Sequence, residues 1–237
     1  HHGYINRVRS ACDALGYPGR FEVLLGQLVN LLRNGKPVKM SKRRGTMITF
    51  RELVDEVGAD AARYTLISRS SNQEIDFDIE KVKAKTQDNP VYYVQYAHAR
   101  ICSVLKKLES EGVKFAGADA VDASVLTDPA EQALIRLLAA FPAEIVAAAD
   151  KYDPARITRY CIDVASAYHR FYNACRIMGT EGAVQQGRIA LCLAVRGVIH
   201  NILTNEKYIG DALLQKPYIT DCISKKVKKN QGERAMY

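Results

Sequence analysis

Lys36-Pro37-Val38-Lys39-Met40-Ser41-Lys42-Arg43-Arg44-Gly45 is the stretch around which this sequence is organised. It contains five cationic side chains, one hydroxyl and a closing glycine within ten residues. Apolar runs flank it, at residues 21–32 before it and at 47–50 after it. A cationic loop between runs that favour β-structure is suited to contact a polyanion. A solvated hairpin tip has the same composition, so the choice between the two interpretations depends on the rest of the chain.

The composition predicts a folded protein with an acidic partner. The chain has 237 residues, of which 48% are hydrophobic, enough for one large domain or two small ones with a real core. The formal net charge is +8 and the isoelectric point is about 9.1. This balance favours nucleic acid first and a membrane surface second, although ordinary surface lysines could also account for it.

The cysteines indicate a reducing compartment and no metal site. There are six, and none forms a Cys-x-x-Cys pair or has a histidine at metal-binding spacing. We also find no apolar run of membrane length and no signal peptide, which predicts a soluble, cytoplasmic protein without a membrane partner. The opening His1-His2 is either the remnant of a tag or a start within a domain.

The first third of the chain mixes helical and β patterns. We expect a helix over residues 3–16, a strand over 21–25, and a hairpin at Asn34-Gly35. Thr49, with Glu52 three positions later, predicts a capping box at the start of a helix that Gly58 ends.

A second helix is expected over 61–69 with Asp60 as its cap. Residues 70–78 are acidic and polar, and a solvated connector fits them better than a metal loop, because a full ligand set is missing.

From Pro90 onward the apolar residues fall at helical spacing. Residues 111–127 predict a linker, Asp128-Pro129 predicts a capped helix start, and Pro142 should break the helix that follows. Asp153-Pro154 predicts another cap, for a helix that ends at Gly179, and the last helix is expected at about 186–203. The predicted fold is therefore an α/β segment followed by an all-α helical bundle, mostly α overall.

Several motifs, in this order, resemble the C-terminal part of bacterial-type arginyl-tRNA synthetases, which are class I enzymes. The Lys-Met-Ser-Lys tetrad at 39–42 resembles the signature loop of that class, and His2-Gly3-Tyr4 matches a family motif. The most specific match is Asn-Pro-Val-Tyr-Tyr-Val-Gln-Tyr-Ala-His-Ala-Arg at 89–100, which begins the family's anticodon-binding domain. The resemblance covers residues 1–203. It implies that 1–87 are the end of the nucleotide-binding catalytic domain, 88–203 a helical anticodon-binding domain, and 204–237 an atypical basic tail.

The resemblance implies an arginine–tRNA ligase of protein synthesis. Such an enzyme makes arginyl-adenylate from arginine and ATP, which comes with Mg²⁺, and passes the arginyl group to its tRNA. Lysines on a loop can hold the departing pyrophosphate more tightly in the transition state than in the ground state. The implied catalytic residues are Lys42 first, then Lys39, with Ser41 holding phosphate or the loop shape. The implied ATP contacts are Lys39, Met40, Ser41, Lys42, His2, Gly3, Tyr4 and Gln27. A helix start packed by Tyr4, and a core-edge amide at Gln27, are the structural alternatives.

The bundle is expected to hold the anticodon stem and loop of the tRNA. Splayed bases are bound by aromatic rings and guanidinium planes. The candidates are Tyr96, Arg100, Arg170 and Arg176, although most rings at helical spacing belong to the core.

Two features depart from the family. The His-x-Gly-His motif that a class I enzyme needs is absent, so we expect this fragment to be inactive alone. Residues 205–237 resemble instead a linker segment of large serine recombinases, without a catalytic serine. Two alternatives therefore stay open: a non-catalytic tRNA-binding helical module, or a chimera that carries a DNA-recombinase segment. Synthetases for cysteine or methionine fit less well, because zinc-type cysteines are missing.

Overall fold

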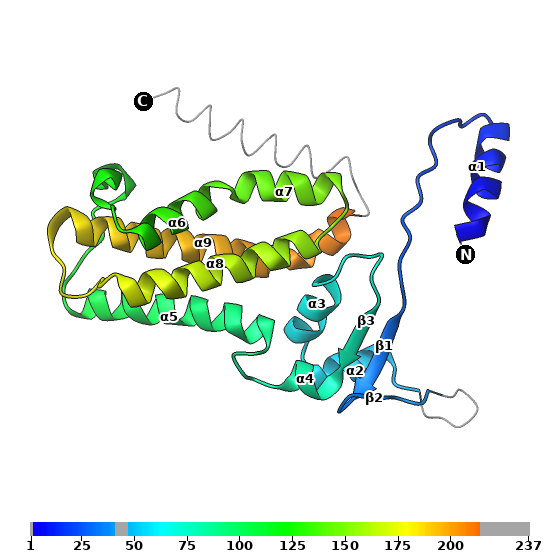
Figure 1. Ribbon diagram of the computed structural model, residues 1–237, viewed down its shortest axis with the longest axis horizontal. Coiled ribbons are helices and arrows are strands. Elements are labelled where there is room, and N and C mark those ends of the chain that lie inside the picture. The colour runs from blue at the N-terminus through cyan, green and yellow to red at the C-terminus, as the bar shows by residue number, and fades with distance from the viewer. Residues whose placement is uncertain (1, 41–46, 214–237) are drawn as a thin grey trace.

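The protein consists of a small sheet with short helices at one end and a long helical bundle at the other (Figure 1). The computed structural model describes residues 2–40 and 47–213, with side chains described as far as residue 204. The chain begins with a 3-10 turn, η1 (His2–Tyr4), and α1 (Ile5–Ala14). In Figure 1, α1 stands apart from the rest of the molecule, at the end of an extended segment. None of its residues is buried.

We expected a strand over residues 21–25, within this extended segment, and this prediction is wrong. Residues 20–28 have no regular structure, and a strand needs a continuous ladder to a neighbour. The first backbone hydrogen bond from this segment to a neighbouring part of the chain is made at Gln27, whose N–H donates to the carbonyl of Ser71 at 2.8 Å. The strand therefore starts later than its apolar pattern suggests.

The sheet has three strands, in the order β2-β1-β3. β1 (Val29–Arg33) and β2 (Lys36–Pro37) are antiparallel and confirm the predicted hairpin. Its turn residues lie in the left-handed region, Asn34 at φ +51° and Gly35 at φ +73°. This conformation suits the twist of a two-residue hairpin and favours asparagine and glycine.

The third strand, β3 (Ile75–Asp78), pairs in parallel with β1 and lies where we expected a polar connector. Ile75 and Phe77 face inward as in any half-buried strand, while Asp76 is exposed. Asp78 is buried, at 4% exposure. The four residues alternate apolar and acidic side chains, as a half-buried strand does, but so short a pattern becomes a strand only through its pairing with β1.

Two helices connect β2 to β3, and a short third helix follows. α2 (Phe50–Val57) begins with the predicted capping box, in which the Glu52 N–H donates to the Thr49 hydroxyl and the Thr49 N–H donates to the Glu52 carboxylate. Gly58 ends α2 as predicted and also caps α3 (Ala59–Ile67). The prediction of Asp60 as that cap is wrong, because its side chain accepts a hydrogen bond from Gln95 instead. α4 (Ile79–Lys83) follows β3.

The bundle confirms the predicted all-α architecture. Its helices are α5 (Pro90–Ser110), α6 (Pro129–Ala139), α7 (Phe141–Asp150), α8 (Ala155–Ala174) and α9 (Gly182–Leu213). The linker over 111–127 contains only two short 3-10 turns, η3 (Ala118–Ala120) and η4 (Ala123–Val125). The Asp128 cap is confirmed, and the chain bends by 40° between α6 and α7 beside Pro142.

Several helix boundaries in the bundle differ from expectation. Asp153 does not cap α8, because Pro154 is the cap residue and Asp153 accepts hydrogen bonds from Ser70 and Arg159. α8 ends at Ala174, before the expected Gly179, and α9 is longer than 186–203. Helix ends depend on contacts that sequence spacing does not show.

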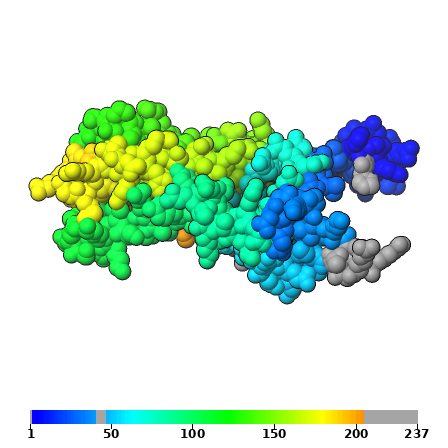
Figure 2. Space-filling model, turned by 60° about the horizontal axis from the view of Figure 1, so that its bottom comes forward, coloured from blue at the N-terminus to red at the C-terminus, as the bar shows by residue number. Residues whose placement is uncertain are grey.

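The molecule is elongated (Figure 2), and one hydrophobic core joins its sheet to its bundle. It runs from Phe77 and Ile79 under the sheet through Tyr64 of α3 to the inward faces of α5, α8 and α9. The buried Tyr64 hydroxyl donates to the carbonyl of Thr158 on α8 at 3.1 Å. This contact fixes α3 against the bundle.

Among the described residues, one helix is long and apolar enough to cross a membrane, over Gly182–Thr204 of α9, which the sequence analysis did not single out. In this structure it packs against α5, α6 and α8, and its apolar side chains Cys192, Val195 and Ile199 are fully buried. The core helix of a bundle has the same properties.

Candidate functional site

The cationic hairpin presents its described side chains to solvent. Lys36 lies on β2, and Lys39 and Met40 follow it, all exposed, with Met40 at 49%. The Val38 N–H donates to the Leu31 carbonyl at 2.9 Å, so the pairing with β1 continues up to the residue before Lys39. Ser41 and Lys42, the other predicted catalytic residues, lie outside the described residues.

An ion-pair network holds this hairpin beside its turn. The Arg33 guanidinium binds both carboxylate oxygens of Glu56, at 2.8 and 2.9 Å, and reaches Glu80 at 2.6 Å. Lys83 adds a contact to Glu56 at 3.2 Å. Arg33, helped by Lys83, lowers the pKa of Glu56 to about 2. The network ties β1 to α2 and α4, and the bidentate geometry adds direction to the attraction.

The predicted nucleotide contacts at the N-terminus are far from the hairpin. His2, Gly3 and Tyr4 form η1, all exposed, and the Arg7 guanidinium lies 5.4 Å from the Tyr4 ring centroid. Figures 1 and 2 both show this end of the chain separated from the sheet. Gln27 is exposed as well. The described structure therefore does not bring the predicted ATP contacts together.

The bundle gathers two of the four predicted tRNA contacts in a cluster of rings between α5 and α8. The Arg100 guanidinium lies 4.1 Å from the ring centroid of Tyr172 and 5.7 Å from that of Tyr96. Tyr96 is 44% exposed, so one part of its ring is open to solvent. A guanidinium held against aromatic faces, beside an exposed ring, is an arrangement that can stack unpaired bases.

His169 completes this cluster and was not among the residues predicted from the sequence. Its Nδ1 lies 3.4 Å from an Arg100 nitrogen, and its ring is 5.7 Å from Tyr96 and 5.2 Å from Tyr93. Guanidinium only donates hydrogen bonds, so Nδ1 acts as the acceptor of a neutral imidazole. Burial and Arg100 lower the pKa of His169 accordingly. Its position three residues before Tyr172 in Tyr-His-Arg-Phe-Tyr places both on one helix face, which is the signal that could have found it.

The other two predicted tRNA contacts, Arg170 and Arg176, are exposed and separate from the cluster. Arg170 lies on α8, where a guanidinium nitrogen donates to the Ser166 hydroxyl at 2.9 Å. Arg176 follows the end of α8, and its carbonyl accepts a hydrogen bond from Arg188 at 2.6 Å. Both residues are exposed to solvent, unlike the half-buried Arg100.

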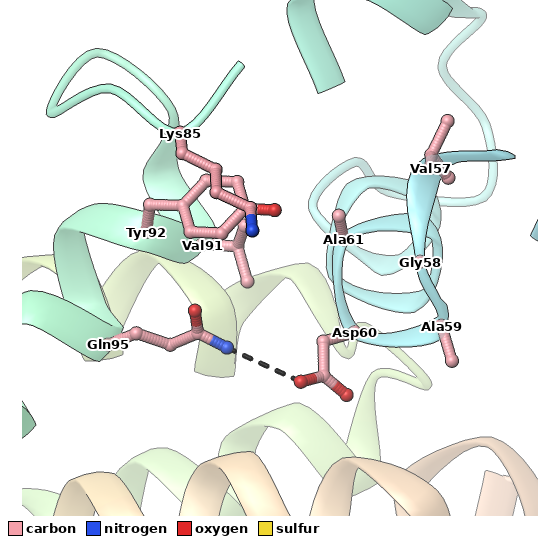
Figure 3. A pocket seen from close by; sticks show the side chains of 9 residues that line it. All are labelled: Val57, Gly58, Ala59, Asp60, Ala61, Lys85, Val91, Tyr92 and Gln95. Carbon is pink, nitrogen blue, oxygen red and sulfur yellow. Dashed lines mark hydrogen bonds between the residues drawn. The ribbon is translucent and has the colours of Figure 1, made fainter. Parts of the chain in front are cut away.

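A cavity of about 260 Å³ lies where α3 meets the start of α5 (Figure 3). Lys85 forms one wall, opposite Asp60, whose carboxylate accepts a hydrogen bond from Gln95 at 3.4 Å. With one cation and one anion on its walls, the cavity shows no preference for the charge of a ligand. No group of three or more His, Cys, Asp or Glu side chains within the described ranges could hold a metal ion.

Three cysteine thiols belong to the core of the bundle. Cys161, Cys175 and Cys192 are buried, and burial raises the pKa of Cys175 to about 11 and that of Cys192 to about 12. Thiols at such pKa values stay protonated near neutral pH and are poor nucleophiles.

Two family models match consecutive parts of the chain. The model described as tRNA synthetases class I (M) matches residues 30–94, and that described as DALR anticodon binding domain matches residues 94–205. The first covers the sheet, the ion-pair network and the start of α5, and the second covers the rest of the bundle. The predicted fold class, the end of a class I catalytic domain followed by a helical anticodon-binding domain, is thereby confirmed.

The curated relatives are arginine–tRNA ligases. The chain is 50% identical over 204 residues to the enzyme of Caldanaerobacter subterraneus, 47% to that of Ruminiclostridium cellulolyticum over the same length, and 46% over 206 residues to that of Oceanobacillus iheyensis. Each alignment covers 86% of this chain but only 36–37% of the relative. The chain therefore spans about a third of the length of these relatives.

Solved structures agree. An arginyl-tRNA synthetase structure from Campylobacter jejuni matches 87% of this chain and 44% of its own, with a TM-score of 0.77 and 31% identity. The Thermus thermophilus enzyme, at 21% identity and a TM-score of 0.66, covers 84% of this chain and 37% of its own and shares the fold. These matches give no support for the predicted resemblance of residues 205–237 to a recombinase, and the side chains of that segment lie outside the described residues.

Proposed function

We propose that this chain, which has the sequence and fold of the C-terminal region of the arginyl-tRNA synthetases, works as that region of an arginine–tRNA ligase. In the proposed reaction the arginine carboxylate attacks the α-phosphorus of ATP. A C–O–P linkage forms and pyrophosphate leaves, with Mg²⁺ arriving bound to ATP. The arginyl group then passes to the terminal ribose of the tRNA and AMP leaves.

The observation that carries this proposal is the placement of Lys39, where the cationic tetrad begins. Its first lysine, Lys39, follows directly on a paired β-hairpin, and the hairpin shares one hydrophobic core with the bundle. A rigid base reduces the entropy lost when a lysine is ordered around a phosphate. In the proposal Lys39 and Lys42 neutralise the departing pyrophosphate, with Met40 and Ser41 shaping the loop.

The second part of the proposal assigns the bundle to tRNA. Tyr96 and Arg100 are placed to stack bases of the anticodon loop, and Arg170 and Arg176 to contact phosphates. We divide the chain into a catalytic segment at 1–87, an anticodon-binding domain at 88–203 and a tail at 204–237; the order of the two family models, which match residues 30–94 and 94–205, supports the first two parts. We place the protein in the cytoplasm, because tRNA charging serves protein synthesis.

The nucleotide contacts at His2, Gly3, Tyr4 and Gln27 belong to a more complete site. All four are exposed here, and large apolar side chains near them are exposed too, including Leu24, Leu25 and Leu28. Neighbouring exposed apolar residues indicate a surface that packs against another part of a protein. We propose that a full nucleotide-binding fold covers this surface and brings the four residues to ATP.

The test is ATP–pyrophosphate exchange by the isolated chain, with arginine and arginine-accepting tRNA present. We expect no exchange above the blank, together with measurable tRNA binding. Exchange by the isolated chain would contradict the fragment proposal. Binding of tRNA by a chain with no affinity for pyrophosphate would instead favour the non-catalytic tRNA-binding module. Preference for duplex DNA that is lost on removing residues 205–237 would favour the recombinase alternative.

A further inference from the structure

Asp78 is a buried carboxylate at the end of β3 whose hydrogen bonds converge on the turn of the neighbouring hairpin. Its oxygens accept the N–H of Gly35 at 2.7 Å and the N–H of Asn34 at 3.2 Å. The same carboxylate accepts the N–H of Glu80 at 3.2 Å and so caps α4. Burial would raise its pKa, but the N–H groups of Gly35, Glu80 and Asn34 lower it, so the group stays ionised.

The two N–H groups that Asp78 holds are those of the hairpin turn itself. Asn34 and Gly35 both have positive φ values, a conformation that asparagine and glycine tolerate but share with other conformations, so contacts to the turn help to select it. Hydrogen bonds to an ionised acceptor are stronger than neutral ones. The carboxylate therefore maintains both the shape of the turn and its position against β3.

The position of the turn determines the position of β2 and of the residue that follows it. Arg33 pairs with Lys36, Leu32 with Pro37, and the Val38 N–H donates to Leu31. This ladder is only a few residues long, so its register depends on the turn. The next residue is Lys39, which is exposed.

We propose that Asp78 is a positioning residue for Lys39: its carboxylate fixes the β1–β2 turn, so that β2 presents the Lys39 ammonium at a fixed place to a phosphate group. The inference rests on the proposed function of Lys39 and extends it to a residue on another strand. Asp78 touches no substrate and acts only through the turn.

Asp76 provides a matched control on the same strand. It is exposed, and its carboxylate accepts a hydrogen bond from the Asn30 side chain at 3.0 Å rather than from the turn. Asp76→Asn and Asp78→Asn raise the net charge of the protein equally. On charge alone, both changes would slightly strengthen the binding of a polyanion. Weaker pyrophosphate binding in Asp78→Asn alone would therefore report the loss of the hydrogen bonds from Asp78 to the turn.

The experiment measures the affinity of inorganic pyrophosphate for the full chain by calorimetry at low salt. The variants are Asp78→Asn, Asp76→Asn, Lys39→Ala and the double variant Asp78→Asn/Lys39→Ala. We expect Asp78→Asn to bind at least threefold more weakly than the wild type, and Asp76→Asn to bind as well as the wild type. Lys39→Ala should weaken binding in the wild type but have little further effect in Asp78→Asn, because a misplaced lysine contributes little.

Amide hydrogen exchange of the same variants tests the effect of Asp78 on the turn separately from pyrophosphate binding. Asp78→Asn should speed exchange at Gly35 and Val38 and leave the amides of α8 unchanged. If Asp78→Asn folds poorly, Gly35→Ala takes its place, because it strains the turn without touching α4. It should likewise speed exchange at Val38 and leave the amides of α8 unchanged.

Equal pyrophosphate affinity in Asp78→Asn and Asp76→Asn, or an equal cost of Lys39→Ala in both backgrounds, would overturn the inference. If the wild type binds pyrophosphate no better than Lys39→Ala, the proposed function of Lys39 fails. The exchange data would then still show whether Asp78 fixes the turn.

Discussion

Replacing Tyr96 by alanine should weaken tRNA binding without destabilising the protein. Its ring is 44% exposed and lies beside the Arg100 guanidinium, so it can offer a face to an unpaired base. Stacking of one base on an aromatic side chain contributes about 1–3 kcal/mol. The dissociation constant should therefore rise by about 5- to 150-fold. The midpoint of thermal unfolding should stay close to that of the wild type, because an exposed ring contributes little to the core.

The assay is equilibrium binding of arginine-accepting tRNA at several salt concentrations. Tyr96→Phe keeps the ring and should bind like the wild type. Arg170→Ala removes an exposed cation, and its effect should differ in kind, because losing one phosphate contact reduces the salt dependence by about one unit. Tyr96→Ala should lower affinity and leave that slope unchanged. Affinity of Tyr96→Ala within twofold of the wild type, or an equal loss in Tyr96→Phe, would refute the stacking role.

Two further predictions concern stability. Glu131 is 1% exposed and binds Arg188 at 2.6 Å, so Glu131→Ala leaves the partly buried Arg188 side chain without its carboxylate partner and should lower the free energy of unfolding in urea by about 3–5 kcal/mol. The control is Glu111→Ala, which changes an exposed residue and should have almost no effect. A loss below about 1 kcal/mol in Glu131→Ala would contradict this prediction. Arg33 lowers the pKa of Glu56 to about 2, below its value in the unfolded chain. The ion pair between the two therefore stabilises the folded protein fully above about pH 4.5, and this contribution is lost as the pH falls toward 2. Glu56→Gln should flatten that part of the curve of unfolding midpoint against pH, and an unchanged curve would show that the network does not stabilise the protein.

The sequence predicts those parts of the fold that depend on short-range chemistry. The Asn34-Gly35 turn, the Thr49–Glu52 capping box and the Asp128 cap each need only a few neighbouring residues, and all are confirmed. The buried stripe of α5 follows from helical periodicity in the same way.

What the sequence did not predict depends on distant partners. β3 was missed because it is only four residues long and its pairing partner, β1, lies far away in the sequence. Asp78 is buried because it accepts hydrogen bonds from a turn 43 residues away. The expected strand over 21–25 failed for the converse reason, since apolar residues without a paired neighbour form no ladder. Among the candidate site residues, Tyr96 and Arg100 lie four positions apart on α5, so helical spacing already brings them together. Tyr172 and His169 join them from α8, because α5 packs against α8. Spacing along one helix cannot show this contact.

The most direct test of the central claim is the affinity of this chain for arginine-accepting tRNA, compared with another tRNA and with duplex DNA of similar length. The measurement should be made at one fixed salt concentration near the physiological value, because charge alone attracts any nucleic acid to a basic protein. We predict that the arginine-accepting tRNA binds at least tenfold more tightly than either competitor, and that Tyr96→Ala removes most of this preference. Equal affinity for all three nucleic acids would contradict the assignment of the bundle as the anticodon-binding part of an arginine–tRNA ligase.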